Sequence, residues 1–380
     1  MIPRTLFQPE HEEFRATVRR FFNEEVMPNH DRWEEQGHID RSMWNRAGEL
    51  GFLCMAIPEQ YGGGGASRLY SMILMEEVAQ ARASATMFHV HSDVVANYIY
   101  NFGREDQKSH WLPKMATGEA VGSIAMTEPG GGSDLQAIRT RAVKDGNDYV
   151  VNGSKIFISN ALNADIFVVA VKTGTEGKGK KDISLILVER NTPGFSRGKL
   201  LKKVGLRGQD TCELFFENVR VPQSNLLGAE EGNGFLQLVK ELAWERLTVS
   251  IAAVTSARVC LDMTLDYTRN RKLFGQSVSE YQNTRFKLAE MKTEISLGQV
   301  YVDRCIELQL KGELTHDTSA MVKYWTTEMH CRVVDQCVQL HGGYGFMLDY
   351  PIAHQYIDSR ASRIYLGTTE IMKEVIARNM

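Results

Sequence analysis

One glutamate of the chain stands among large apolar side chains. Glu245 lies in the segment ELAWERL, whose spacing predicts a helix, and Leu242, Trp244 and Leu247 are its neighbours. Apolar surroundings disfavour the charged form of a carboxylate, so they raise its pKa toward the range of a general base. A Glu-Arg pair in a helix is also common on solvent-exposed faces. The spacing alone therefore leaves a catalytic and a surface interpretation open.

Three further regions combine glycine with hydroxyl, aromatic or amide side chains. They are AMTEPGGGSD at 125–134, GSKIFISN at 153–160, and QLHGGYGF at 339–346 with the following YLGTTE at 365–370. Consecutive glycines allow the backbone to approach a flat or anionic ligand closely, with N–H groups as donors. Each region also has an ordinary structural explanation, as a domain connection, an amphipathic strand or a helix cap.

Two of these regions place polar groups where a ligand would meet them. Phe157 and Ser159 are two residues apart on a predicted strand and face the same side, which suits stacking on a planar ring and bonding to it. Thr368 or Thr369 is a suitable N-cap for a closing helix. The free N–H groups of that helix terminus favour an anion or a carbonyl oxygen.

The elements that must position these residues change character twice. Helical periodicity marks about residues 10–118 and again about 233–380, where residues 288, 291, 295, 302 and 306 share one apolar face. Short strands are predicted at 148–151, 154–159, 166–171, 183–188 and 212–216, with an exposed loop at 174–181. Asn152-Gly153 favours a type I′ turn, so the first two strands are predicted to form a hairpin. The predicted domains are residues 1–120, 121–230 and 231–380.

The overall composition excludes several classes of protein. The 44 Lys+Arg and 47 Asp+Glu give a net charge of −3, which argues against an electrostatic nucleic-acid binder. With 43% hydrophobic and 24% charged residues, the chain has the composition of a soluble globular protein. No apolar run reaches the roughly 18 residues of a membrane span. The acidic N-terminal segment is unlike a secretory or organelle-targeting sequence, so we expect a cytoplasmic, bacterial protein without integral membrane contact.

The cysteines and the longest glycine run do not indicate a metal or a Rossmann site. The six cysteines form no CxxC pair and have no histidines at zinc spacing, so we expect reduced thiols and no metal. The run Gly62–Gly65 has no GxGxxG pattern and no flanking βαβ unit.

Taken in order, the segments resemble an acyl-CoA dehydrogenase over about residues 6–377. AMTEPGGGSD, NGSKIFISN, RNRKLFGQSVSEYQ, QLHGGYGF and YLGTTEIMKE are all similar to signature stretches of that family. Five collinear matches are far more specific than any one of them. Within the family, ELAWERL, VKYW at 322–325 and YPIAHQYID at 350–358 resemble the long-chain type.

The resemblance implies an α+β fold: an N-terminal α-helical domain, a middle β-barrel domain and a C-terminal four-helix bundle. It also implies non-covalent FAD between the last two domains, and a homotetramer built as a dimer of dimers. By motif match, the cofactor contacts are Met126, Thr127, Ser133, Phe157, Ser159, Arg271, Phe274, Gln282, Gln339, Gly342, Gly343, Thr368 and Glu370. Those from Arg271 to Gly343 correspond to positions that hold the FAD diphosphate and adenine across a subunit boundary. Many relatives carry Gln at position 370, and an ionised Glu only accepts hydrogen bonds.

The position of the catalytic base separates the members of the family. Medium- and short-chain members carry a glutamate directly before the Gly-Thr of the last motif, where this chain has Leu366. Long-chain and isovaleryl types place it on a bundle helix directly before an arginine, which Glu245-Arg246 matches. The resemblance thus implies that Glu245 is the general base. The implied substrate contacts are Ser133, Ala243, Trp244, Arg246, Leu366 and Gly367.

The implied reaction is FAD-dependent α,β-dehydrogenation of a saturated acyl-CoA, long-chain or branched, to the trans-2-enoyl-CoA in fatty acid β-oxidation. Glu245 would remove the α-proton while a hydride leaves to flavin N5, and an electron-transfer flavoprotein would take the electrons. A flavin ribityl hydroxyl and the backbone N–H of Leu366 would hold the thioester oxygen as enolate charge develops. The helix at 88–102 would floor the acyl pocket, with Val94, Val95, Ala96 and Ile99 as candidates and the inward face left open.

Other functions stay open at this point. The rival substrates within the class are short branched thioesters of the isovaleryl or citronellyl type. Because Leu366 replaces the glutamate that other members carry in the last motif, a catalytically silent subunit that binds acyl-CoA or flavin is a second alternative. An acyl-CoA oxidase is disfavoured, since oxidases of the family usually carry a further C-terminal domain. A helical scaffold without flavin is the remaining alternative.

Overall fold

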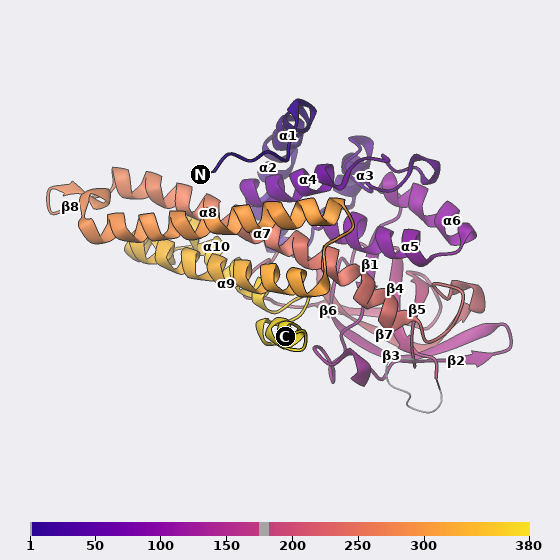
Figure 1. Cartoon of the computed structure of the whole chain (residues 1–380). Coiled ribbons are helices and arrows are strands. Elements are labelled where there is room, and N and C mark those ends of the chain that lie inside the picture. Colours follow the sequence, from indigo (N-terminus) through magenta and orange to yellow (C-terminus); the bar gives the residue numbers. More distant parts are fainter. Residues whose placement is uncertain (1, 175–181) are drawn as a thin grey trace.

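The computed structural model describes residues 2–174 and 182–380, arranged as N-terminal helices, a curled sheet and a long helical bundle (Figure 1). This confirms the predicted three-part α+β architecture. The N-terminal part contains α1 (Pro9–Phe21), η1 (Phe22–Val26), α2 (Met27–Gln36), α3 (Arg41–Glu49), η2 (Glu59–Tyr61), α4 (Arg68–Ala81), η3 (Val90–Val95), α5 (Ala96–Phe102) and α6 (Glu105–Ala116). Its core surrounds the buried indoles of Trp33 and Trp44.

The middle part is a sheet that in the described residues has seven strands. They are β1 (Gly122–Ala125), β2 (Arg141–Asp145), β3 (Asp148–Ser159), β4 (Ile166–Lys172), β5 (Ile183–Glu189), β6 (Phe195–Leu200) and β7 (Thr211–Pro222). The strands pair in the order β1-β4-β2-β3-β7-β6, with β5 also on β4. Both faces of β4 are buried. Val168 packs in the core with α5 and α6, whereas Phe167 and Val169 pack in the core enclosed by the curled sheet.

The predicted hairpin at Asn152-Gly153 is wrong. Those residues lie inside the single strand β3, at an irregularity where β3 passes β7. The side chain of Asn152 accepts a hydrogen bond from the backbone of Asn218 at 2.9 Å, and Gly153 has φ +148. A bulge and a tight turn both need a residue with a permissive backbone, so the dipeptide signals either one. The turn lies instead at 146–147, since Asp145 pairs with Asp148. Most of the predicted 174–181 loop lies outside the described residues.

The C-terminal part is a bundle of long helices. It contains α7 (Gly234–Asn270), α8 (Gln282–Leu310), α9 (His316–His341), α10 (Pro351–Ser359) and α11 (Thr369–Ala377), with the hairpin β8 (Lys272–Leu273) and β9 (Gln276–Ser277) at its tip. The predicted apolar face of α8 is confirmed, because residues 288, 291, 295, 302 and 306 are all buried. Helix α7 is long and apolar enough to cross a membrane, yet 72% of its apolar window is buried inside the molecule, as in a core helix.

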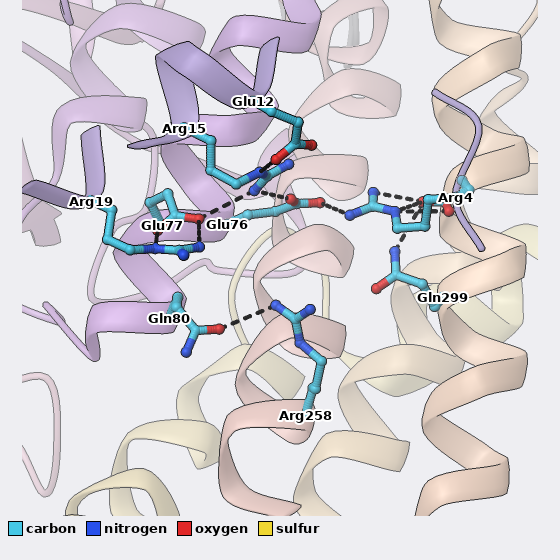
Figure 2. A network of polar contacts seen from close by, with 10 residues as sticks. Arg4, Glu12, Arg15, Arg19, Glu76, Glu77, Gln80, Arg258 and Gln299 are labelled. Carbon is cyan, nitrogen blue, oxygen red and sulfur yellow. Dashed lines mark hydrogen bonds and ion pairs between the residues drawn. The ribbon is translucent and has the colours of Figure 1, made fainter. Parts of the chain in front are cut away.

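A network of ion pairs joins the N-terminal segment to α4 and the bundle (Figure 2). Arg4 contacts Glu76 of α4 at 2.7 Å and Asp303 of α8 at 2.8 Å. Arg15 also reaches Glu76, at 2.7 Å, and Glu77 at 3.2 Å. Both glutamates are buried, and removing one partner of a buried ion pair costs about 3–5 kcal/mol. The network therefore fixes α4 against the bundle.

The cysteines of the described residues are free thiols, as predicted, and all of them except Cys331 are buried. Burial raises the pKa of Cys212 and of Cys305 to about 11, so both stay protonated at neutral pH. We expect them to be inert packing residues, because the thiolate is the reactive form.

Candidate active site

Glu245 lies where α7 passes α5, and its side chain has no exposed surface. The predicted apolar neighbourhood is present, since Trp244 and Leu247 are buried beside it. One carboxyl oxygen, Oε1, accepts a hydrogen bond from the hydroxyl of Tyr98 at 3.0 Å. The other oxygen, Oε2, is buried without a partner in the described part of the chain. The carboxyl is therefore oriented at one oxygen and free at the other.

The surroundings of Glu245 bring its titration close to neutral pH. The pKa of Glu245 is raised to about 7, and burial is the largest cause. The charge of Glu241 also raises this pKa, whereas the Tyr98 hydrogen bond and the charge of Arg246 lower it. Glu241 is itself held by Asn101, whose amide donates to it at 2.8 Å. The raised pKa of Glu245 agrees with the expectation from the sequence. A carboxyl with such a pKa can take up and release a proton near pH 7.

The C-terminal loop is tied to α9 by a buried lysine. Nζ of Lys323 donates to the carbonyl oxygen of Gly367 at 2.7 Å, and burial lowers the pKa of this amine to about 8. Leu366 and Gly367 both have positive φ, +53 and +96. Of the two predicted candidates, Thr368 is the N-cap of α11, because its hydroxyl accepts from the N–H of Ile371. The loop thus has one defined backbone path beside the bundle.

The residues assigned to the flavin ring lie on the sheet and on the glycine-rich loop before it. Phe157 is 65% exposed at φ +62, and Ser159 is half-buried on the same strand. The loop is anchored by Lys155, which contacts Glu128 at 2.8 Å and donates to the carbonyl of Met126 at 3.0 Å. A Cβ added at Gly130 would meet nothing within 4 Å. An exposed ring on a strained backbone beside an open loop fits a planar cofactor.

The residues assigned to the FAD diphosphate and adenine lie at the opposite end of α7. They are Arg271, Phe274, Gln282, Gln339, Gly342 and Gly343. Arg271 stacks on Tyr344 at 5.5 Å, Phe274 is 98% exposed, and a Cβ at Gly342 or Gly343 would meet nothing within 4 Å. At 1.5 Å per residue, Arg271 is about 39 Å along α7 from Glu245. This group of predicted cofactor residues therefore lies far from the proposed base of the same chain.

A cavity of about 150 Å³ begins one turn beyond Glu245, at the junction of the three parts of the molecule. Thr248 and Val249 of α7 line its near end, and Tyr365 precedes the C-terminal loop. From the 88–102 segment, Phe88 and His89 line the cavity. The four candidate lining residues, Val94, Val95, Ala96 and Ile99, are buried in the core between α5, α6 and the sheet.

The predicted substrate contacts are distributed unevenly. Arg246 is buried next to the base, and its Nε lacks a partner in the described residues. Its positive charge helps to lower the pKa of the nearby amine of Lys323. Trp244 instead points to the N-terminal part, where its Nε1 donates to the carbonyl of Asp93 at 3.0 Å. Ser133 is exposed on the glycine-rich loop.

The comparison with known proteins decides the family. Profiles of the acyl-CoA dehydrogenase N-terminal, middle and C-terminal domains match residues 8–119, 123–219 and 232–380. The chain belongs to the acyl-CoA dehydrogenase family. It is 46% identical over 378 residues to the mitochondrial long-chain specific acyl-CoA dehydrogenase of Sus scrofa, covering 99% of this chain and 88% of that protein.

Solved structures agree with this assignment. An acyl-CoA dehydrogenase from Geobacillus kaustophilus superimposes with a TM-score of 0.97 at 49% identity and 99% coverage of both chains. A glutaryl-CoA dehydrogenase from Mycobacterium smegmatis, solved in complex with FADH2, has a TM-score of 0.90 at 29% identity, covering 98% of this chain and 95% of that one. As an acyl-CoA dehydrogenase, the protein is an FAD-dependent oxidoreductase that acts on acyl-CoA thioesters.

Three residues around the site were missed by the sequence analysis. Tyr98 reaches Glu245 from a helix nearly 150 positions earlier, and Lys323 reaches the C-terminal loop from α9. His330 lines the cavity. Lys323 and His330 are polar residues on the apolar side of α9, which is a signal for a functional or paired group. Their partners cannot be found without the fold.

Proposed function

We propose that this acyl-CoA dehydrogenase oxidises long-chain saturated acyl-CoA thioesters, with Glu245 as the base. The observation that carries the proposal is the fully buried carboxyl of Glu245, oriented by Tyr98 at one oxygen and unpartnered at the other. The unpartnered Oε2 accepts the α-proton of the thioester. A carboxyl with a pKa of about 7 is an efficient base near neutral pH.

The C-terminal loop supports the developing enolate. The backbone N–H of Leu366 donates to the thioester oxygen, so an aliphatic side chain is acceptable at this position. Lys323 maintains the path of the loop through the Gly367 carbonyl. Bound FAD supplies the acceptor for the β-hydride. The full burial of Glu245 keeps water away from the base.

The cofactor is shared between two chains in this proposal. Phe157, Ser159, Met126, Thr127, Ser133, Thr368 and Glu370 serve the flavin side of one subunit. The tip residues, from Arg271 to Gly343, serve the FAD of another subunit, because they lie about 39 Å from the base along α7. This arrangement supports a homotetramer built as a dimer of dimers. The electron acceptor is an electron-transfer flavoprotein, and the enzyme works in the bacterial cytoplasm.

Anaerobic flavin reduction tests the proposal. The purified protein should be yellow and should bleach with palmitoyl-CoA, and Glu245→Gln should retain the colour without bleaching. Thioesters of four to eighteen carbons, including isovaleryl-CoA and citronellyl-CoA, rank the substrates. A coloured protein that bleaches with none of them is a silent binding subunit. Rapid reoxidation in air with peroxide formation identifies an oxidase.

A further inference from the structure

Helix α4 lies between the cavity and the polar network of Figure 2. One face of the helix lines the cavity with Leu74, Met75, Val78 and Ala79. The side chains of this helix that belong to the network are Glu76, Glu77 and Gln80. At about 3.6 residues per turn, these two sets are centred on opposite faces of α4. The contacts on the outer face therefore fix the position of one cavity wall.

Two polar connections join the outer face of α4 to the bundle (Figure 2). In the first, Arg4 contacts Glu76 of α4 at 2.7 Å and Asp303 of α8 at 2.8 Å. In the second, Nη2 of Arg258 on α7 donates to Oε1 of Gln80 at 3.2 Å. Because their partners lie on α7 and α8, both connections resist movement of α4 away from the bundle.

The other ion pairs on this face join α4 to α1 instead. Arg15 contacts Glu76 at 2.7 Å and Glu77 at 3.2 Å. Arg19 contacts Glu77 at 2.8 Å. Glu76 therefore keeps one cation when Arg4 is removed, so that change leaves no buried carboxylate of α4 without a partner. The contacts of α4 with the bundle can thus be altered separately from its contacts with α1.

The cavity is small for a long acyl chain. Its volume is about 150 Å³, and a cavity of about that size in another protein holds a single benzene ring. A palmitoyl chain has many more carbon atoms than this ring, so its entry requires the walls to separate. A second wall of the cavity, with Thr248, Val249 and Ala253, belongs to α7, which is part of the apolar core of the bundle. Separation of α4 from α7 would widen the cavity and stretch both polar connections.

We propose that Arg4 and Gln80 are positioning residues that set the chain-length preference of the enzyme, because they hold α4 at its distance from α7. Within the described part of the chain, neither side chain lines the cavity, so both act through α4. A short acyl chain fits the cavity as it stands, whereas a long chain is accepted only when the two connections yield. This inference rests on the proposed function, since it assigns the cavity to the acyl chain.

Flavin reduction with a long and a short thioester tests the assignment. The measured quantity is the ratio of kcat/KM for palmitoyl-CoA to kcat/KM for hexanoyl-CoA, with thermal unfolding and FAD content recorded for each variant. Arg4→Met breaks the first connection and Gln80→Leu the second. Arg4→Lys is the conservative variant, because it keeps a positive charge between the two acids.

Arg19→Met is the matched control. It removes an ion pair of the same helix, but this pair joins α4 to α1 and not to the bundle. If the ion pairs only stabilise the fold, Arg4→Met and Arg19→Met should lower the unfolding temperature and change kcat/KM for both thioesters by the same factor. The ratio for the two chain lengths is therefore insensitive to a purely structural role.

The expected result is a higher palmitoyl-to-hexanoyl ratio in the variants that free α4 from the bundle. Arg4→Met should raise the ratio about tenfold, the effect of a methylene-sized change in an apolar pocket. Gln80→Leu should raise it by a smaller factor, because only one hydrogen bond is lost. Arg4→Lys should stay close to wild type, and Arg19→Met should equal it.

Three outcomes would overturn the assignment. The first is an unchanged or lower ratio in Arg4→Met and Gln80→Leu, and if Arg4→Met does not fold, Gln80→Leu alone decides. The second is an equal rise in Arg19→Met, which would mean that any loosening of the N-terminal part has the same effect. The third is a wild-type enzyme that oxidises neither thioester, in which case the proposed function fails and this inference fails with it.

Discussion

The two ends of helix α7 differ in how much of their site one chain completes. At the Glu245 end, the side chain is fully buried, and Tyr98 and Lys323 arrive from other helices to hold the carboxyl and the C-terminal loop. At the Arg271 end, the hairpin tip presents Phe274 with 98% exposure and φ +51. A non-glycine residue in that conformation is strained, and a large exposed aromatic ring is an unused contact surface.

This difference assigns separate tasks to the two ends. Proton transfer needs a desolvated, oriented group, and one chain can provide that by packing. In the proposed assembly, the cofactor also needs a second surface, and the exposed tip would offer that surface to another subunit. We therefore expect changes at the base end to alter rates with little effect on FAD content. Changes at the tip should alter FAD content and assembly first.

The largest expected effect comes from Glu245→Gln. The amide keeps the shape of the side chain but cannot take the α-proton, so the rate of flavin reduction should fall about 1,000-fold, within the range for a general base. Stopped-flow reduction under anaerobic conditions measures this rate. Glu241→Gln, one turn earlier and held by Asn101, is the matched control and should retain most of the activity. A similar loss in both variants would mean that the helix, and not the carboxyl of Glu245, is responsible.

A smaller loss is expected from Lys323→Met. The variant leaves the Gly367 carbonyl unpartnered and releases the loop that positions the Leu366 N–H, so kcat should fall about tenfold to 100-fold. FAD content should stay near one per chain, which separates the effect from a folding defect. Thr326→Val is the control, because that hydroxyl bonds the backbone of its own helix. Loss of FAD together with activity in Lys323→Met would place the lysine in cofactor binding.

The sequence predicted the elements better than the contacts between them. The apolar face of α8 follows from one helical period and was correct. Residue type and position limited the N-cap of the closing helix to Thr368 or Thr369, and Thr368 is the cap. Asn152-Gly153 was misplaced, since its flexible backbone suits a bulge as well as a turn. A sequence pattern therefore predicts an element well when interactions between residues close in the sequence stabilise that element.

The site shows the same limit. Glu245 was singled out by its apolar neighbours in the sequence and then assigned as base by the resemblance of Glu245-Arg246 to the long-chain type. Its raised pKa agrees with the burial that those neighbours predict. Tyr98 and Lys323 were missed because their partners are distant in the chain. The inward face of the 88–102 segment was left open by the sequence, and the structure adds that its middle, Val90–Val95, is a π-helical turn.

Changes at the tip should separate cofactor binding from chemistry. Phe274→Ala and Arg271→Ala remove the exposed ring and the cation stacked on Tyr344, so the affinity for FAD should fall about tenfold. Absorbance ratios after desalting measure FAD content, and sedimentation measures assembly. At saturating FAD, the reduction rate should return to the wild-type value. Full FAD retention in both variants would contradict the proposed sharing of the cofactor between subunits.

The smallest expected effect, and the most specific for the base end, is a shift in pH dependence. With a pKa of about 7, Glu245 is protonated and inactive at low pH, so kcat/KM should rise with pH and level off above 7. The hydroxyl of Tyr98 lowers that pKa by bonding the charged carboxylate. Tyr98→Phe should therefore move the rise to higher pH, with a loss of several-fold at pH 6 and little loss at pH 9.

The shift distinguishes a contact with the base from general packing. Tyr100→Phe, on the same helix, is the control; its ring packs near Tyr61, and it should leave the profile in place. A rate lowered equally at every pH in Tyr98→Phe would mean that the hydroxyl orients the carboxyl without affecting its proton affinity. A shift to lower pH would contradict the donated hydrogen bond. The expected upward shift would link the buried position of Glu245 directly to the rate of proton removal.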